Sequence, residues 1–269
     1  MNDAILSNPK APRVKRAAAL ARKKERHEQG RFLVEGPQAV RELLAHRPDL
    51  AETVYASTGT EPWQHEVDRL ASDAGVRIER ATDEVIAAMS ETVNPQGVVA
   101  VARSWRTEVA DALRGARLVA ILHEIRDPGN AGTVLRAADA AGADAVVFSG
   151  ESIDPFHPKV VRSTTGSLFH LPVAVASTLA EALDAARDAG LTSLAADVRG
   201  AELLEARAEG LLAGPVAWVF GNEARGLSEA DRAMTDRSLK LPIYGAAESL
   251  NLATAASVLL YETAFSQRG

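Results

Sequence analysis

Short apolar segments alternate with amphipathic helical segments along almost the whole chain. In the first part, strands are predicted at residues 31–35, 53–56, 76–79 and 97–102, with helices over 36–46, 62–74 and 83–89. Parallel strands need long crossover connections, and helices usually supply them. The alternation therefore predicts an α/β fold with a mostly parallel sheet covered on both faces.

The same alternation returns after a polar stretch at residues 103–115, which contains Trp105. Strands are predicted at 118–123, 145–148, 173–176, 192–196, 216–220 and 239–242, and helices at 131–141, 159–168, 179–189, 229–235 and 250–265. We expect Trp105 to cap a core or to fill an interdomain contact. The predicted organisation is an N-terminal arm at 1–30, a first domain at 31–104, a linker at 105–115 and a second domain at 116–269.

Composition excludes several classes of protein. The chain has no cysteine, so it has neither disulfides nor thiolate metal sites. It shows no apolar core of a secretion signal and no run of 18 apolar residues. We therefore expect a cytoplasmic protein that does not cross a membrane.

Charge is distributed unevenly along the chain. The formal net charge is −6, yet residues 1–31 hold nine basic and only three acidic side chains. A basic segment on an acidic body suits contact with a phosphate backbone, and a solvated, partly helical tail explains the pattern equally well. One helix is predicted in this segment, from Pro12 to Gln29, with Gly30 ending it.

Three Gly-containing motifs follow predicted strands of the second domain, where ligands bind in open parallel sheets. The first, DPGNAGTVLR, spans residues 127–136. Asn130 stands where a helix should begin, either as an N-cap or as a site residue. Arg136 lies among small apolar residues, and its guanidinium must reach out of that packing toward a partner or ligand.

The second and third motifs are FGNEARG at residues 220–226 and LPIYGAAESLN at 241–251. Gly221 permits a close backbone approach or an unusual φ, and Glu223 suits either a helix cap or a positive group. Ser249 and Asn251 both stand at the start of the last predicted helix, where one cap would be enough.

The sequence disfavours dinucleotide and nucleoside-triphosphate sites, metal sites and a serine catalytic triad. The second motif keeps only the outer glycines of a nucleotide loop and lacks its lysine, so a NAD enzyme or an NTPase is not indicated. The six histidines show no metal-ligand spacing, and no metal site is expected. Ser163 and Ser167 precede His170 without indicating a Ser–His–Asp triad.

The three motifs closely resemble those of the SpoU/TrmH family of RNA ribose 2′-O-methyltransferases, over about residues 115–267. Residues 159–173 are also similar to that family, and residues 32–44 resemble the start of the ribosomal-protein-like substrate-binding domain that precedes many of its catalytic domains. The resemblance implies a trefoil-knotted, parallel-sheet methyltransferase domain that binds S-adenosyl-L-methionine in the knot. It also implies a homodimer whose active site uses residues of both protomers.

Site residues follow from the resemblance, motif by motif. It implies a set of catalytic residues and a set of cofactor-binding residues, and the latter includes the end of the predicted strand at 192–196. The catalytic set is Asn130, Arg136, Glu223, Ser249 and Asn251, and the cofactor set is Leu194, Ala195, Ala196, Gly221, Leu241, Ile243 and Leu250.

Arg136 is the activator that the resemblance implies for attack by a ribose 2′-hydroxyl on the methyl group. An arginine stays protonated and is a poor base, so we expect it to orient the hydroxyl and stabilise its developing charge, with an RNA phosphate as a candidate proton acceptor. Asn130 and Ser249 would orient Arg136 and the ribose, Glu223 would hold Arg136 or Asn130, and Asn251 would fix the third-motif loop.

The expected substrate is RNA, most simply large-subunit rRNA, because of the additional N-terminal domain. Aromatic residues make up only 4% of the chain, so recognition by shape and backbone is favoured over base stacking. A tRNA 2′-O-methyltransferase, an antibiotic-resistance methyltransferase of similar layout, and a non-catalytic RNA-binding or ribosome-assembly factor remain alternatives.

Overall fold

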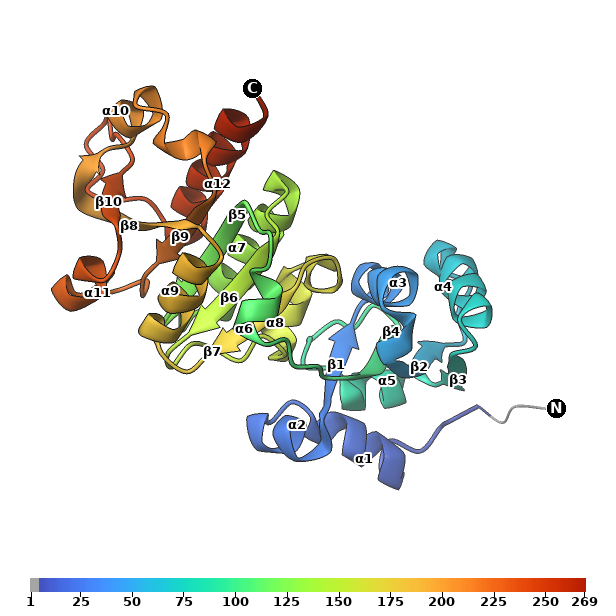
Figure 1. Ribbon diagram of the computed structural model, residues 1–269. Coiled ribbons are helices and arrows are strands. Elements are labelled where there is room, and N and C mark those ends of the chain that lie inside the picture. Colours follow the sequence, from blue (N-terminus) through green and yellow to red (C-terminus); the bar gives the residue numbers. More distant parts are fainter. Residues whose placement is uncertain (1–4) are drawn as a thin grey trace. The chain divides into compact units, whose positions relative to one another are not determined.

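The chain forms two compact units in a computed structural model that describes residues 5–269 (Figure 1). The first unit comprises the chain up to Trp105 together with residues 156–170, and the second comprises residues 106–155 and 171–269. The segment 156–170 therefore leaves the second unit between two of its strands and belongs to the first. Residues 1–4 of the predicted arm lie outside the described part.

The first unit is built on a four-stranded sheet of order β1-β4-β2-β3. Five helices precede or connect its strands, and a sixth helix comes from the segment 156–170. The elements are α1 (Pro12–Ala19), α2 (Lys23–Gln29), β1 (Arg31–Glu35), α3 (Pro37–His46), β2 (Ala51–Ser57), α4 (Pro62–Asp73), β3 (Arg77–Ala81), α5 (Asp83–Met89), β4 (Val98–Arg103) and α8 (Pro158–Ser163), with 3₁₀ turns η1 (Pro48–Leu50) and η2 (Ser167–Phe169).

The sheet of the first unit is mixed, so the expectation of a mostly parallel sheet is wrong there. β4 lies between β1 and β2 and runs antiparallel to both, and only β2 and β3 are parallel. The loop at residues 90–97 is long enough for the chain to reach the opposite end of the sheet after α5 and then begin β4 there. Alternation alone does not determine strand direction, because a helix followed by a long loop can deliver the chain to either end of a sheet.

The basic N-terminal segment forms two helices, and α1 packs into the core of the first unit. Val14, Ala17 and Leu20 are buried there with residues of α5. The buried Arg26 donates through Nη1 to the carbonyls of Leu20 and Ala21, at 3.0 and 2.8 Å. These bonds satisfy carbonyl groups at the end of α1, so the predicted single helix is interrupted between Ala19 and Lys23.

The segment 156–170 is held in the first unit by aromatic packing. The ring centroids of Phe32 and Phe156 are 4.8 Å apart, and Trp105 lies at the same distance from Phe156. Trp105 thus completes this cluster. The predicted helix at 159–168 breaks after Ser163, because Thr165 and Gly166 both have positive φ.

The second unit contains a fully parallel six-stranded sheet of order β10-β8-β9-β5-β6-β7, as the alternation predicted. Its helices cover both faces. The elements are α6 (Val109–Ala112), β5 (Leu118–His123), α7 (Pro128–Ala141), β6 (Ala145–Ser149), β7 (Val173–Ala176), α9 (Leu179–Asp188), β8 (Thr192–Glu202), α10 (Leu203–Ala208), η3 (Leu211–Ala213), β9 (Val216–Phe220), α11 (Glu229–Ala233), β10 (Arg237–Lys240) and α12 (Leu252–Arg268).

The two faces of this sheet have separate cores. Val119, Ile121 and Val147 point toward α6 and α9, whereas α7 and α12 pack together on the other face (Figure 1). The short helix α6 lies in the stretch that the sequence indicated as polar. Every described helix is too short or too polar to cross a membrane.

Trp218 anchors α12 to the sheet. Its side chain is fully buried in β9, and its Nε1–H donates to Oγ1 of Thr263 on α12, at 2.8 Å. We expect Thr263→Val to lower the free energy of unfolding by about 1–3 kcal/mol, because the shape is kept while a buried donor loses its acceptor. Urea unfolding measures the change, and Thr60→Val, at an exposed loop position, should have little effect. Equal stability of the Thr263 variant and the wild type would contradict this assignment.

Candidate active site

The three sequence motifs leave β5, β9 and β10 at the same edge of the parallel sheet (Figure 1). β5 and β9 are direct neighbours, and β8 separates β9 from β10. Because parallel strands all point the same way, residues that follow their carboxyl ends meet above one edge. The fold thus brings together segments that are about a hundred residues apart in the chain.

Glu223 joins the second motif to the first. Its Oε1 accepts from the backbone N–H of Asp127 at 2.9 Å, and its Oε2 accepts from that of Arg126 at 3.2 Å. Both amides belong to the loop that leads into α7. Glu223 therefore positions this loop by its backbone and does not directly hold the side chain of Arg136.

The second-motif loop folds back tightly onto the end of β9. A Cβ atom at Gly221 would lie 2.6 Å from the backbone of Gly226 and 2.7 Å from Leu227, so only glycine fits. Asn222 donates through Nδ2 to the carbonyl of Glu124 at 2.8 Å, and Arg225 pairs with the carboxylate of Glu124 at 2.6 Å. Two further contacts thus join the loops after β5 and β9.

Asn251 joins the third motif to the first. It caps α12, because its Oδ1 accepts from the backbone N–H of Ala253 at 2.9 Å and of Thr254 at 3.3 Å. Its Nδ2 donates to Oδ1 of Asn130 at 3.1 Å. The last helix therefore begins two residues later than predicted, and Asn251 has both a capping and a linking function.

Asn130 is not the N-cap of α7. That position belongs to Asp127, whose Oδ1 accepts from the backbone N–H of Asn130 at 2.7 Å, with Pro128 at the first helical position. An Asp-Pro pair is a recognised start signal, and reading it would have placed the helix three residues earlier. The side chain of Asn130 is consequently available to Asn251.

Arg136 is an exposed residue of α7, and within residues 5–269 its guanidinium makes no hydrogen bond or ion pair. Six residues separate it from Asn130, which places the two on different sides of the helix. Ser249 is exposed in the loop before Asn251. A single chain therefore connects Asn251 to Asn130 directly and Glu223 to Asn130 through Asp127, and it presents Arg136 and Ser249 to solvent.

The predicted cofactor residues divide between the loops at this edge and the interior of β8, which continues to Glu202, beyond the predicted strand end at residue 196. Leu241 and Ile243 line a cavity of about 640 Å³ formed by the third-motif loop and the segment around β8 and α10. Leu194 and Ala195 are buried in β8, Ala196 is half-buried, and Leu250 is 43% exposed. The cavity walls combine apolar side chains with carboxylates and one lysine: Val198, Leu204, Glu202, Glu205, Glu248 and Lys240.

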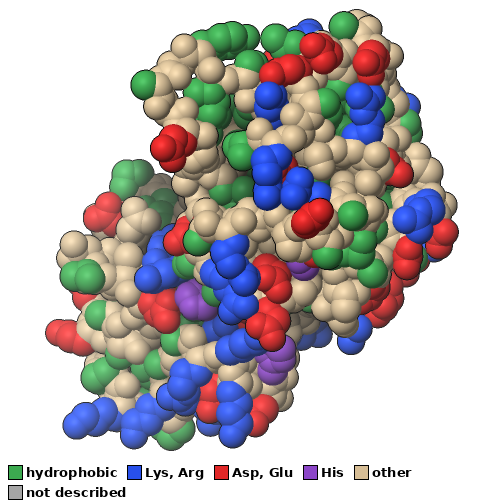
Figure 2. Space-filling model, turned by 90° about the vertical axis from the view of Figure 1, so that its left-hand side faces the viewer, with side chains coloured by type: hydrophobic (Ala, Val, Ile, Leu, Met, Phe, Trp, Pro, Cys, Tyr) green, Lys and Arg blue, Asp and Glu red, His purple; other side chains and the backbone are tan. Residues whose placement is uncertain are grey.

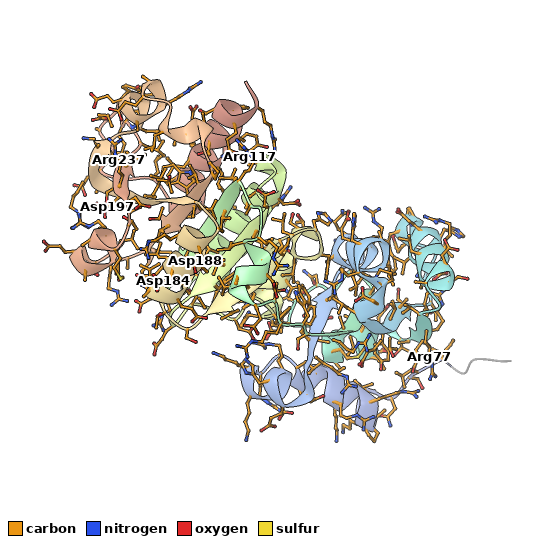
Figure 3. The ribbon with its side chains drawn as sticks, viewed as in Figure 1. Arg77, Arg117, Asp184, Asp188, Asp197 and Arg237 are labelled. Atoms are coloured by element: carbon orange, nitrogen blue, oxygen red, sulfur yellow. The ribbon has the colours of Figure 1, made fainter. Side chains whose placement is uncertain are left out.

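An ion-pair cluster that sequence reasoning missed connects β8 with the second-motif loop. Arg199 contacts both oxygens of the buried Asp197 at 2.8 Å and also donates to the carbonyl of Leu227 at 3.1 Å. Asp197 lies beside α11 in Figure 3, and Nε of Arg232 on that helix is 3.6 Å from its carboxylate. These hydrogen bonds, above all those from the Arg199 side chain, hold the pKa of Asp197 below its ordinary value against the opposing effect of burial.

Comparisons with known proteins agree with this geometry. The profile described as the SpoU rRNA Methylase family matches residues 117–261, and that of the MRM3-like substrate binding domain matches residues 11–100. A Bacillus subtilis relative named 23S rRNA (guanosine(2553)-2′-O)-methyltransferase RlmP is 34% identical over 262 residues, which cover 95% of this chain and 97% of the relative.

A second relative, from Streptomyces viridochromogenes, is named 23S rRNA (uridine(2479)-2′-O)-methyltransferase. It is 30% identical over 253 residues, covering 91% of this chain and 86% of the relative. The crystal structure of the SpoU methyltransferase AviRb of that organism, in complex with the cofactor AdoMet, superimposes with a TM-score of 0.82 at 28% identity, covering 95% of this chain and 98% of that one.

The parallel sheet and its three joined loops define an α/β enzyme of the RNA methyltransferase class. The chain belongs to the SpoU rRNA Methylase family. This membership confirms the family resemblance, the α/β methyltransferase fold with a preceding substrate-binding domain, and the enzyme class, an RNA 2′-O-methyltransferase that uses S-adenosylmethionine.

Asp197→Asn tests the ion-pair cluster through its pH dependence. Because the folded-state pKa of Asp197 is lowered, its carboxylate stabilises the fold above the unfolded-state value of about 3.9, and this contribution is lost as pH falls. At pH 7 the variant should lose about 1–3 kcal/mol, and its stability should then fall less steeply than that of the wild type between about pH 5 and pH 2.

Urea midpoints measured across this pH range provide the comparison. Asp184→Asn is the matched control, because Asp184 pairs with Arg187 at the surface, where both side chains are about two-thirds exposed. It should follow the wild-type profile. Parallel profiles for wild type and Asp197→Asn would refute the assigned role of Asp197.

Proposed function

We propose that this protein transfers a methyl group from S-adenosylmethionine to a ribose 2′-hydroxyl of large-subunit rRNA. The observation that carries the proposal is the joining of the three motif loops: Glu223 binds the loop before α7, and Asn251 binds Asn130. A tRNA substrate is less well supported, because the two relatives above match most of this chain and both are named as 23S rRNA enzymes.

The residues around the third-motif loop fit S-adenosylmethionine. Leu241 and Ile243 offer apolar surface for a flat heterocycle, and the carboxylates of the cavity wall suit a ligand that carries positive charge. Gly221 and the buried first part of β8, with Leu194 and Ala195, would form the adjoining wall. The bound cofactor supplies an electrophilic methyl group on a positively charged sulfur.

Arg136 is the proposed activator. Its exposed guanidinium has five N–H donors and, within the described chain, no partner that would have to be displaced. Donation to the ribose 2′-oxygen would orient the hydroxyl and stabilise the negative charge that develops as the proton leaves. An RNA phosphate is the proposed acceptor of that proton.

The other catalytic residues are proposed to position this reaction. Glu223 would act through the backbone of Arg126 and Asp127, which fixes the start of α7. Asn251 would hold the third-motif loop at Asn130 while it caps α12. Ser249 is exposed and would contact the ribose or Arg136 once RNA is bound.

A homodimer is proposed because α12 presents an unpartnered apolar stripe. Val258, Tyr261 and Phe265 recur at the spacing of one helix face and are 42%, 38% and 58% exposed. Tyr261 also donates to the carbonyl of Ala140 on α7, which places the stripe beside the exposed face that contains Arg136. Association of two copies through these helices would bring Arg136 toward the partner subunit, and the trefoil knot is proposed on the family resemblance.

RNA contact is proposed for the first unit, with its basic N-terminal segment and its match to a substrate-binding domain. Lys and Arg side chains are interspersed with acidic ones on the face drawn in Figure 2. The basic side chains would contact RNA phosphates, and the acidic ones between them would limit binding to an RNA whose backbone fits their arrangement. The proposed location of this activity is the cytoplasm, which agrees with an rRNA substrate.

Arg136→Ala should reduce methyl transfer to rRNA by about 100-fold or more, because a donor to the reacting oxygen is lost. Arg136→Lys should restore only part of the rate, since one ammonium group replaces a planar fork of donors. Transfer of labelled methyl groups to rRNA measures the rate, and calorimetry should show that S-adenosylmethionine still binds. Arg187→Ala, at a surface ion pair on α9, is the control. A folded Arg136→Ala protein with near wild-type activity would exclude this role.

Val258→Glu combined with Phe265→Glu should weaken self-association at least about 100-fold, because two carboxylates would be buried without partners. Analytical ultracentrifugation across a concentration series measures the monomer–dimer equilibrium. Val93→Glu is the matched control, because Val93 is also exposed (93%) but lies in the first unit, outside this stripe. A wild-type chain that sediments as a monomer at high concentration would contradict the proposed dimer.

A further inference from the structure

Two histidines share one carboxylate in the first unit, whereas the three motif loops belong to the second. Oε2 of Glu42 lies 3.3 Å from Nε2 of His46 and 3.2 Å from Nε2 of His170. The two imidazole rings are 4.3 Å apart between centroids. The three potential ligand atoms all lie within 4.8 Å of one another.

We propose that Glu42, His46 and His170 bind one divalent transition-metal ion of the zinc type. Zinc takes nitrogen and oxygen ligands at about 2.0–2.2 Å in tetrahedral sites, so neighbouring ligand atoms lie about 3.3 Å apart. The two distances from Glu42 to the histidines already match that spacing. Magnesium and calcium prefer ligand sets made of oxygen and fit this one less well.

The backbone holds the three ligands in place. Glu42 and His46 stand four residues apart on α3 and therefore project from the same side of the helix. His170 follows η2, and Gly166, with φ +109°, is the residue before η2. A Cβ atom at Gly166 would collide with the side chain of Glu42, so glycine is needed for this close approach.

Surrounding contacts prepare Glu42 for a cation. Nε2 of Gln38 donates to its Oε1 at 2.6 Å, which orients the carboxylate and leaves Oε2 facing the histidines. The nearest arginine on the helix, Arg41, is paired with Glu66 at 2.8 Å. His46 is half-exposed, and this opening gives the ion an entry path and leaves room for water as a fourth ligand.

The ion would have a structural function. His170 is the last residue of the segment 156–170, which belongs to the first unit although the chain before and after it belongs to the second. A metal shared with α3 would hold the end of that segment in the first unit. The site departs from the expectation of no metal, because residues 42, 46 and 170 meet only in the folded chain.

Zinc titration of the full-length, chelator-treated protein by calorimetry tests the proposal. We expect one zinc per chain, with affinity reduced at least about 10-fold in each of Glu42→Gln, His46→Ala and His170→Ala. His65→Ala is the control, because His65 is an exposed histidine of α4 outside the cluster, and its affinity should be unchanged. Cobalt substitution should give a visible absorption band that the His170 variant lacks.

Thermal unfolding separates metal binding from loss of the contact itself. Zinc should raise the melting temperature of the wild type and of His65→Ala but leave that of His170→Ala unchanged, because a ligand stabilises only a fold that binds it. The increment between metal-free and zinc-loaded protein is the readout, so a variant that is less stable without metal remains informative. Absence of zinc binding to the wild type, or equal binding by wild type and His170→Ala, would overturn the proposal.

Discussion

Every contact in the candidate active site depends on the parallel pairing of β9 with β5 on one side and β8 on the other. This pairing sends the chain out of β5, β9 and β10 at the same edge, where backbone groups and a few side chains can join the following loops. Glu223 then binds two backbone amides across nearly a hundred residues of sequence, and Asn251 links α12 to α7. A strand running the other way would place one motif at the opposite edge and break this network.

Some of the proposed site residues are bound within the chain, and others are exposed to solvent. This division supports the proposed assembly of the site from two chains. Within a single chain, Asn251 binds Asn130, and Glu223 binds the backbone of the loop before α7. Arg136 lies on another side of α7 and is exposed beside the apolar stripe of α12. If Arg136 acted only within its own chain, we would expect its side chain to lie nearer the contacts between the motif loops. The same packing of α7 on α12 stabilises the unit and, in the proposed dimer, forms the surface through which a second copy would complete the site.

The sequence predicted those parts of the fold in which a local pattern is compatible with only one structure. The second unit is parallel as predicted, since buried apolar strands separated by helices leave few alternatives. The first unit departs from the prediction because β4 enters between β1 and β2 from the opposite end, after a loop that imposes no direction. The N-terminal helix is interrupted by the contact between Arg26 and the end of α1, and no helical periodicity reveals such a bond. Asp127 was missed although its Asp-Pro signal was readable.

The sequence by itself determined the family, the six strands of the second unit and the three motifs that follow them, because motifs and periodicity are local properties of the chain. Tertiary structure alone decided which contacts the residues of these motifs make. Glu223 turned out to hold backbone amides, Asn251 both caps and links, and Asp197 with Arg199 ties β8 to the second-motif loop. It also placed His170 beside Glu42 and His46, although 124 residues separate His170 from His46. Distances between remote residues follow from packing, which no single stretch of sequence contains.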